Sequence, residues 1–251
     1  MRLQNRVAIV TGGGKGIGRT YSMRLAQEGA RVCVADIDQS AAEQTSAEIR
    51  DLGGEALPIH LDVGNPESIE EMTRLAMKRF GRIDVLVNNA ALYSVLDRIS
   101  FTEITTDEWD RVMTINVRGV FQCSQAVYLH MKAQGKGKII NISSGAVFPA
   151  SSNMAHYVTS KMAVIGLTRA LAREMGKDNI CVNAITPGPT ASGVNERISP
   201  PERLSNMAAK RSIPRIQKPE DLTGTVVFLA SDDRDFRAGQ VLNVDGGLVF
   251  H

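Results

Sequence analysis

The sequence predicts an α/β fold in which helices cover both faces of a parallel sheet of seven strands. Short apolar runs rich in β-branched residues alternate with longer segments of helical pattern along the whole chain, as expected for such a sheet. Turn-forming residues follow two of the runs directly, TGGGKGIG after the first and SSG after the fifth. The 251 residues contain no long linker, so we expect one domain spanning residues 1–251.

The composition excludes several classes of protein. The 29 Lys and Arg residues nearly balance the 27 Asp and Glu residues and are scattered, so no nucleic-acid footprint is visible. No window approaches the roughly 20 apolar residues of a membrane span, and MRLQNRVAIV does not resemble a signal peptide. The three cysteines lie in apolar contexts, as buried thiols in a reducing compartment do. We expect a cytoplasmic protein without nucleic-acid or membrane partners.

The strands are predicted from the apolar runs, and each is bounded by turn residues or charges. They are expected at Arg6–Val10, Arg31–Ala35, Ala56–Leu61, Ile83–Val87, Lys138–Ile142, Ile180–Ile185 and Gln240–Val244.

The helices are predicted from composition and from their ends. Pro66 suits a first helical turn, and Gly29, Gly53 and Gly176 close the segments before them. The helices are expected at Arg19–Glu28, Ser40–Leu52, Pro66–Phe80, Thr106–Lys132, Met154–Met175 and Pro219–Leu229. Residues 190–211 are polar with few core positions, so we expect a mobile flap there, with a short helix near Glu202–Lys210.

The glycine cluster lies between the first strand and the first helix, which is the context of a phosphate-binding turn. Its spacing, Gly12-x-x-x-Gly16-x-Gly18, differs from G-x-G-x-x-G. Glycines still let backbone amides approach a pyrophosphate, and a helix N-terminus offers free N–H groups. A tight turn with no ligand is the structural alternative.

Asp36 ends the second strand, 18 residues after Gly18, close to the offset of about 20 residues expected of an acid on the adenosine ribose. A carboxylate there accepts hydrogen bonds from the ribose hydroxyls and repels a 2′-phosphate, which favours NAD over NADP. Lys15, inside the glycine turn, could meet a 2′-phosphate and argues the other way. We give Asp36 the greater weight.

Polar residues also follow later strands, at the edge where ligands of parallel sheets bind. These are Asp62-Val63, Asn88-Asn89-Ala90, Ser143-Ser144 and Pro187-Gly188. Asp62 suits the adenine edge, with capping of the next turn as its alternative. His60, His130 and His251 show no metal-ligand spacing, so no metal is expected.

Tyr157 and Lys161 follow Ser144 and lie four residues apart, so in a helix they share a face. A neighbouring ammonium lowers the pKa of a phenol, which would let Tyr157 donate and accept a proton. Asn116 lies among apolar residues and is expected to be buried and hydrogen-bonded, either as a structural link or as catalytic support.

These motifs resemble those of the short-chain dehydrogenase/reductase family over essentially the whole chain. The matching residues are Thr11-Gly12-x-x-x-Gly16-Ile17-Gly18, Asp62-Val63, Asn88-Asn89-Ala90, Asn116, Ser144, Tyr157-x-x-x-Lys161 and Pro187-Gly188. Ala91 departs from the family's usual glycine. The resemblance implies a Rossmann-type, doubly wound sheet of order 3-2-1-4-5-6-7. It also implies a homotetramer with Thr106–Lys132 and Met154–Met175 at a subunit interface.

The resemblance also implies roles for individual residues. Tyr157 would be the acid/base, Lys161 would hold the nicotinamide ribose, Ser144 the substrate oxygen and Asn116 a water. The expected cofactor-binding residues are Gly12, Lys15, Gly16, Ile17, Gly18, Asp36, Ile37, Asp62, Val63, Asn88, Asn89, Ala90, Tyr157, Lys161, Pro187, Gly188 and Thr190. The expected substrate pocket consists of Tyr93, Val95, Ser144, Val147, Phe148, Ser152, His156 and Met207, with His156 as a wall or surface residue.

We therefore expect an NAD(H)-dependent oxidoreductase that interconverts a secondary alcohol and a ketone. The C-terminal third resembles phenylethanol-type and pyridoxal-type dehydrogenases. One alternative is an NADPH-dependent 3-oxoacyl-[acyl-carrier-protein] reductase, which a basic patch of Arg203, Lys210 and Arg211 would favour. A non-catalytic NAD-binding regulator is a further alternative, against which the presence of both Tyr157 and Lys161 argues.

Overall fold

The computed structural model describes residues 1–232 and 236–250, so His251 lies outside the described residues. Within these ranges seven strands form one sheet in the order β3-β2-β1-β4-β5-β6-β7, as the sequence predicted. Each neighbouring pair is parallel. The strands are β1 (Val7–Thr11), β2 (Arg31–Asp36), β3 (Ala56–His60), β4 (Val85–Asn88), β5 (Gly137–Ile142), β6 (Ile180–Pro187) and β7 (Val241–Val244).

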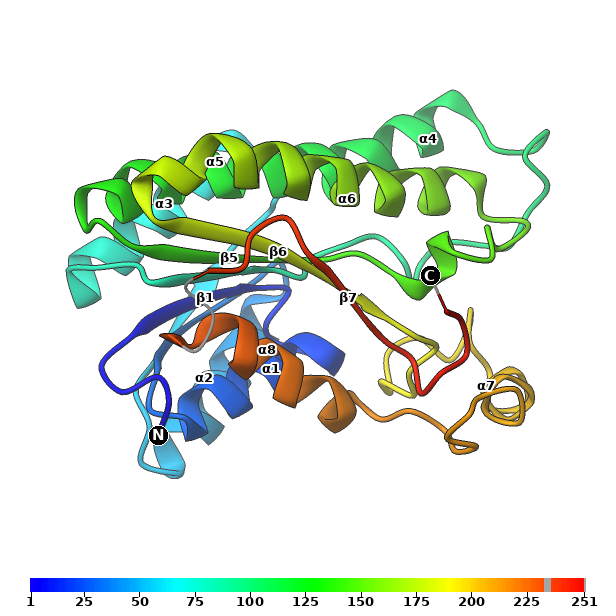
Figure 1. Cartoon of the computed structure of the whole chain (residues 1–251), viewed down its shortest axis with the longest axis horizontal. Coiled ribbons are helices and arrows are strands. Elements are labelled where there is room, and N and C mark those ends of the chain that lie inside the picture. Colours follow the sequence, from blue (N-terminus) through cyan, green and yellow to red (C-terminus); the bar gives the residue numbers. More distant parts are fainter. Residues whose placement is uncertain (233–235, 251) are drawn as a thin grey trace.

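Helices form a layer on each side of the sheet (Figure 1). One layer holds α1 (Gly16–Gln27), α2 (Gln39–Asp51) and α8 (Thr223–Ala230). The other holds α3 (Pro66–Phe80), α4 (Thr106–Met113), α5 (Gly119–Ala133) and α6 (Ala155–Met175). A short helix, α7 (Pro201–Ala208), lies beyond the sheet on the segment between β6 and β7. No helix among the described residues is long and apolar enough to cross a membrane.

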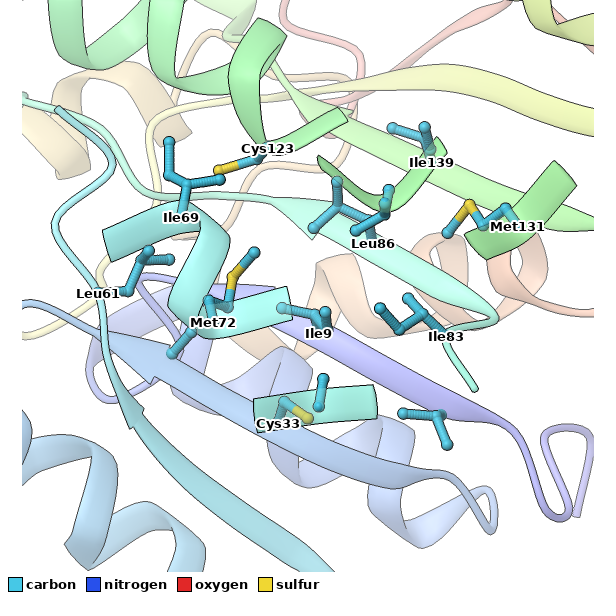
Figure 2. Packing of buried hydrophobic residues seen from close by; sticks show 14 of the residues in the cluster. Ile9, Cys33, Leu61, Ile69, Met72, Ile83, Leu86, Cys123, Met131 and Ile139 are labelled. Atoms are coloured by element: carbon cyan, nitrogen blue, oxygen red, sulfur yellow. The ribbon is translucent and has the colours of Figure 1, made fainter. Parts of the chain in front are cut away.

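Two apolar cores fill the space between the sheet and its helix layers. Ile9 and Leu86 face α3 and α5, where Met72 and Cys123 pack against them, as Figure 2 shows. Their strand neighbours, such as Val10, belong to the other core. Successive strand residues point to opposite faces, so burial on both faces requires the continuous apolar runs seen in the sequence.

Cys33, Cys123 and Cys181 are buried, as their apolar contexts predicted, and they form no disulfide among the described residues. Burial raises the pKa of both the Cys33 and Cys123 thiols to about 12, so these two remain protonated and unreactive at neutral pH.

The long helix predicted over Thr106–Lys132 is not continuous. It consists of α4, a π-helical turn at Thr114–Arg118, and α5. Directly after the π turn, Gly119 lies against the loop that follows β3. A Cβ added to Gly119 would be 2.9 Å from the carbonyl oxygen of Val63, so the two segments pack closely. Apolar residues continue through this turn, so the sequence reading took the whole segment as one helix.

The segment expected as a polar flap has more core contacts than its composition suggested. Ile198, Leu204 and Ala208 are buried. Ile198 belongs to a small apolar cluster with Leu96, Val112, Met154 and Tyr157. The expected short helix is present as α7. This segment, residues 190–211, therefore packs over the carboxyl edge of the sheet, and we refer to it as the flap.

Candidate active site

A cavity of about 1270 Å³ lies along the carboxyl edge of the sheet. Most of the predicted site residues line it together. On the expected cofactor side these are Gly12, Lys15, Ile17, Gly18, Asp36, Ile37, Asp62, Val63, Asn89, Ala90, Tyr157, Lys161, Pro187, Gly188 and Thr190. On the expected substrate side they are Tyr93, Ser144, Ser152 and Met207.

The glycine turn brings the start of α1 close to the end of β1. A Cβ on Gly18 would lie 1.9 Å from the carbonyl oxygen of Gly12, so only glycine fits there. Gly12 itself has a φ of 61°, in the left-handed region that favours glycine. Within the described chain, the N-terminus of α1 has no side-chain cap and no acidic residue in its first turn. Its positive dipole end is therefore left for an anion from outside the chain.

Asp36 lies at the end of β2 with its carboxylate held by two backbone amides. Its Oδ2 accepts a hydrogen bond from Gly14 N at 2.9 Å, and its Oδ1 accepts one from Asp38 N at 3.0 Å. A carboxylate has about four acceptor sites, so this one can still accept from ligand hydroxyls.

Lys15 is held by a residue that the sequence reasoning missed. Its Nζ lies 2.5 Å from Asp38 Oδ2. The pKa of Asp38 is lowered to about 2, with this hydrogen bond as the largest cause and the one from Ala41 N as the next. Asp38 also caps α2, with its carboxylate accepting from Ala41 N. The Asp36-x-Asp38 spacing, one acid on the strand end and one at a helix start, was the signal available in the sequence.

Tyr157, Ser144 and Lys161 come together where β5 ends and α6 begins. The Tyr157 ring packs against the ring of Tyr93, with 4.9 Å between centroids. The Nζ of Lys161 lies 5.9 Å from the centroid of the Tyr157 ring and donates to Ile142 O at 2.9 Å. Ser144 Oγ accepts from Ala146 N at 3.2 Å, which orients the hydroxyl at the start of a short 3₁₀ turn.

Burial is the largest influence on the pKa values of Tyr157 and Lys161. It raises the pKa of the Tyr157 phenol above its usual value of 10, and the Tyr93 side chain raises it further, while a hydrogen bond from Ser144 lowers it. Burial also lowers the pKa of Lys161 to about 8. Contrary to expectation, the pKa of Tyr157 in the protein alone is raised and not lowered, and desolvation of the phenolate is the largest cause.

Asn116 is buried beneath the cavity in the π turn and does not line it. Its Oδ1 accepts from Leu92 N at 2.7 Å, and its Nδ2 donates to Leu92 O at 3.2 Å and to Ser160 Oγ at 3.1 Å. The amide thus joins the loop after β4 to α6, next to Tyr157 and Lys161.

Comparisons with known proteins agree with this geometry. A family profile described as enoyl-(acyl carrier protein) reductase matches residues 12–249. A 3-oxoacyl-[acyl-carrier-protein] reductase of Thermotoga maritima is 36% identical over 250 residues, 99% of this chain and 100% of that one. The chain belongs to the short-chain dehydrogenase/reductase family.

Two further relatives support the same assignment. An uncharacterized oxidoreductase of Mycobacterium tuberculosis is 40% identical over 245 residues, which cover 98% of each chain. The crystal structure of levodione reductase matches with a TM-score of 0.92 and 31% identity over 98% of each chain. As a short-chain dehydrogenase/reductase, the protein is an oxidoreductase that uses a nicotinamide cofactor and acts on a small molecule.

Asn88, expected among the cofactor-binding residues of this family member, points away from the cavity. Its Nδ2 donates to Ser124 Oγ at 3.1 Å and to Asn141 Oδ1 at 2.9 Å, inside the α5–α6 side of the protein. Asn89 lines the cavity instead and donates to the carbonyl oxygens of Thr11 and Gly12. Adjacent side chains at a strand end point to opposite faces, so only one of the two could face the ligand.

Other expected lining residues of the dehydrogenase site also lie elsewhere. Val95 is exposed, Val147 is buried in the 3₁₀ turn, and neither they nor Phe148 lines the cavity. Gly16 begins α1 and is covered by the flap. A Cβ added to Gly16 would be 2.8 Å from the Val194 side chain.

His156 is a clear correction, because it is neither a cavity wall nor a surface residue. It is fully buried against α4, with its Nε2 3.5 Å from Glu108 Oε1. One residue along a helix turns a side chain by about 100°, so Tyr157 faces the cavity while His156 faces the neighbouring helix.

The cavity also carries basic side chains that sequence reasoning only partly identified. Arg98, Arg111, Arg203 and Lys210 line it. Arg211, expected in the same patch, is buried and donates to Pro189 O, which makes it a structural support for the loop after β6. The described residues contain no cluster of three or more His, Cys, Asp or Glu that could hold a metal ion.

Proposed function

We propose that this protein is an NAD(H)-dependent enzyme that interconverts a secondary alcohol and a ketone by hydride transfer, with Tyr157 as the acid/base. One observation carries the proposal. Tyr157, Ser144 and Lys161 line the same cavity as the glycine turn and Asp36. A proton donor, a hydrogen-bonding hydroxyl and a nucleotide-binding edge are thus available to one bound complex.

The residues present fit a dinucleotide. The cavity exceeds the roughly 300–1,000 Å³ typical of sites for single small ligands, which leaves room for a cofactor and a substrate together. The uncapped N-terminus of α1 suits the pyrophosphate, and Asp36 suits the adenosine ribose. When bound, the nicotinamide supplies the hydride chemistry, and the protein positions it.

NAD is favoured over NADP by the charges around the adenosine ribose. Asp36 and Asp38 place two carboxylates there, and Lys15 is already paired with Asp38. A 2′-phosphate would therefore meet uncompensated negative charge, whereas ribose hydroxyls would meet acceptors.

The protein side of the reaction follows from burial. Because burial holds the Tyr157 phenol protonated at neutral pH, it is ready to donate its proton to a ketone oxygen as that oxygen gains charge. The Ser144 hydroxyl would donate a hydrogen bond to the same oxygen. In the oxidation direction the phenolate must form, and the Lys161 ammonium 5.9 Å from the ring centroid would stabilise it.

The alternative, an NADPH-dependent 3-oxoacyl-[acyl-carrier-protein] reductase, draws support from Arg203 and Lys210 at the cavity and from the Thermotoga maritima relative. The acidic pair at the ribose end argues against NADPH, and Arg211 contributes nothing to a basic patch at the cavity. We therefore keep the NAD-linked alcohol dehydrogenase as the conclusion.

The experiment is a panel of secondary alcohols and ketones assayed with NAD(H) and NADP(H) for the wild type and Tyr157→Phe. We expect wild-type turnover to favour NAD, and Tyr157→Phe to lower kcat by about 10²–10⁴-fold because the proton donor is gone. NADH binding, measured by fluorescence titration, should be unchanged.

Tyr128→Phe is the matched control, since Tyr128 lies on α5 and its hydroxyl bonds to Asp178, away from the cavity. It should retain wild-type turnover. Near-wild-type turnover of Tyr157→Phe would disprove the assignment of Tyr157, and a strong NADP preference would favour the reductase alternative.

A further inference from the structure

Two arginines from different segments face the substrate end of the cavity. Arg98 lies on the loop between β4 and α4, and Arg203 lies on α7 of the flap. Both line the cavity together with Ser152, Ser199 and Met207.

Neither guanidinium forms an ion pair with a carboxylate among residues 1–232 and 236–250. The adjacent Asp97 pairs with Arg197 of the flap. Burial and the positive charge of Arg203 both lower the pKa of Arg98, while Tyr93 raises it. The two guanidinium groups therefore repel each other at the cavity.

Arg98 also has an unused donor. Its Nη1 donates to Ser152 O at 3.3 Å, which fixes the side chain along the cavity wall. Its Nε is buried, and no acceptor for it occurs in the described chain. A buried donor without a partner is costly, so a ligand that draws the guanidinium toward the cavity and offers an oxygen to Nε would relieve that cost.

The arginines belong to the same chamber as the reacting groups. Tyr93 Oη and Ser199 Oγ share a hydrogen bond at 3.0 Å, which joins the loop before Arg98 to the flap before Arg203. The ring of the same Tyr93 packs on Tyr157. A substrate with its reacting carbon at Tyr157 therefore has the arginines within its own chamber.

We propose that Arg98 and Arg203 bind an anionic group of the substrate, a carboxylate or a phosphate, while its alcohol or ketone faces Tyr157. This inference rests on the proposed function and narrows it to hydroxy acids, keto acids or phosphorylated alcohols. Guanidinium groups bind both anions through paired N–H donors. The cofactor's own phosphates have donors elsewhere, at the glycine turn and the α1 N-terminus.

The anion would also hold the flap. Arg98 and Arg203 repel each other across the loop and α7, so an anion between them replaces repulsion with two attractions. Substrate binding would thereby add to the existing links between the same segments, Tyr93–Ser199 and Asp97–Arg197.

The test uses three alcohols that differ only at one end: 1,3-butanediol, 3-hydroxybutyrate and 3-hydroxybutyl phosphate. A second set, 1,5-hexanediol, 5-hydroxyhexanoate and 5-hydroxyhexyl phosphate, places the anion two carbons further from the reacting alcohol. KM is measured with NAD, and Kd is measured by calorimetry on the NADH complex. We expect at least one anion to bind about tenfold or more tighter than its diol, as charge-assisted hydrogen bonds imply. Whether the carboxylate or the phosphate binds tighter identifies the source of the anion.

Arg98→Met and Arg203→Met should each remove most of this preference, by weakening anion binding far more than diol binding. Arg98→Lys should restore part of it. Arg197→Met is the matched control, because it removes a positive charge from the same flap at an exposed position that does not line the cavity. It should keep the preference.

Equal affinity for anions and diols in both sets, or a preference that survives both methionine variants, would overturn the proposal. Failure of the proposed function gives a different result. In that case no alcohol is oxidised by the wild type, while the calorimetric comparison of acid with diol still decides whether the arginines bind an anion.

Discussion

Lys161 is buried by the fold, and few interactions offset the cost of removing its ammonium from water. Its side chain is 3% exposed, its ammonium has one hydrogen bond, to Ile142 O, and burial lowers its pKa from 10.5 to about 8. A lowered pKa in a lysine means that the folded protein disfavours the charged form. The residue proposed to stabilise the phenolate thus destabilises the fold.

Lys161→Met should therefore raise the free energy of unfolding at pH 7 while abolishing turnover. The pKa difference corresponds to about 3 kcal/mol, and loss of the hydrogen bond to Ile142 offsets about 1 kcal/mol, which leaves a gain of about 2 kcal/mol. Urea unfolding of both proteins measures it, with Lys78→Met on the exposed face of α3 as the control.

The sign of the pH dependence follows from linkage. Below about pH 8 the lysine is charged in both states, so wild type carries the full cost. Between about pH 8 and 10.5 the folded lysine has lost its proton while the unfolded one retains it, so wild-type stability rises with pH. The advantage of Lys161→Met should shrink across this window, and an advantage that grew there would contradict the burial argument.

Residue types and spacing were enough to predict which residues gather at the site, but not which way each one points. Asn88 and Asn89 are identical in type and adjacent, and only the sheet geometry decides that Asn89 faces the cavity. His156 and Tyr157 are both aromatic and polar, and the packing of α6 on α4 decides that the histidine is enclosed. Side-chain direction depends on partners distant in sequence, which single-sequence patterns do not contain.

Among the elements, the π turn between α4 and α5 has the clearest link to the site. It holds Asn116 where its amide meets both the backbone of Leu92 and the hydroxyl of Ser160. The asparagine was predicted to be buried and hydrogen-bonded, and it is. Its role in holding a water stays a prediction. Its hydrogen bonds to Leu92, on the loop after β4, and to Ser160, on α6, are observed.

Asn116→Leu should cost about 2–3 kcal/mol of stability, because a buried amide and carbonyl of Leu92 lose their partners. Asn116→Asp keeps the acceptor for Leu92 N but loses both donated bonds and buries a carboxyl group, so it should destabilise the fold as well. Urea unfolding measures both losses.

Kinetics separates a positioning role from a purely structural one. If Asn116 positions α6, its variants should lower kcat more than they raise KM, since Tyr157 is the group displaced. A change confined to stability would leave Asn116 as a structural link only.

At the scale of the whole molecule, the alternation of strands and helices predicted the two helix layers, and the family resemblance implied the strand order, which the structure confirms. It could not indicate how the flap packs, because Ile198 and Leu204 are isolated apolar residues in a polar segment. The burial of Ile198 depends on a surface formed by Leu96, Val112 and Met154 from other elements.

The outer faces of α4, α5 and α6 carry exposed apolar side chains. Trp109, Phe121, Leu129 and Met162 are at least one-third exposed, and Phe121 borders a groove with Met113 and Val117. A face of this kind is typical of a subunit contact. We propose that it forms the interface of a homotetramer, as the family resemblance implies.

Phe121→Glu should break this contact, because a carboxylate would be buried without a partner in the assembly. Light scattering after size-exclusion chromatography should give a tetramer for wild type and a smaller species for the variant. Phe101→Glu, at a more exposed residue of the loop before α4, is the control and should remain tetrameric. A wild-type monomer would refute the assembly.

The buried side-chain amides of Asn88 and Asn141 affect the direction in which Tyr157 projects from α6. Asn88 bonds to Asn141, whose Nδ2 donates to Thr168 Oγ1 on α6 at 2.9 Å. Thr168 lies eleven residues after Tyr157, which is about three full turns, so both project from one side of the helix. The hydrogen bonds of Asn88 and Asn141 therefore restrain the rotation of α6 about its own axis. Because Tyr157 projects from the same helix, these buried amides also restrain the direction in which its phenol enters the cavity.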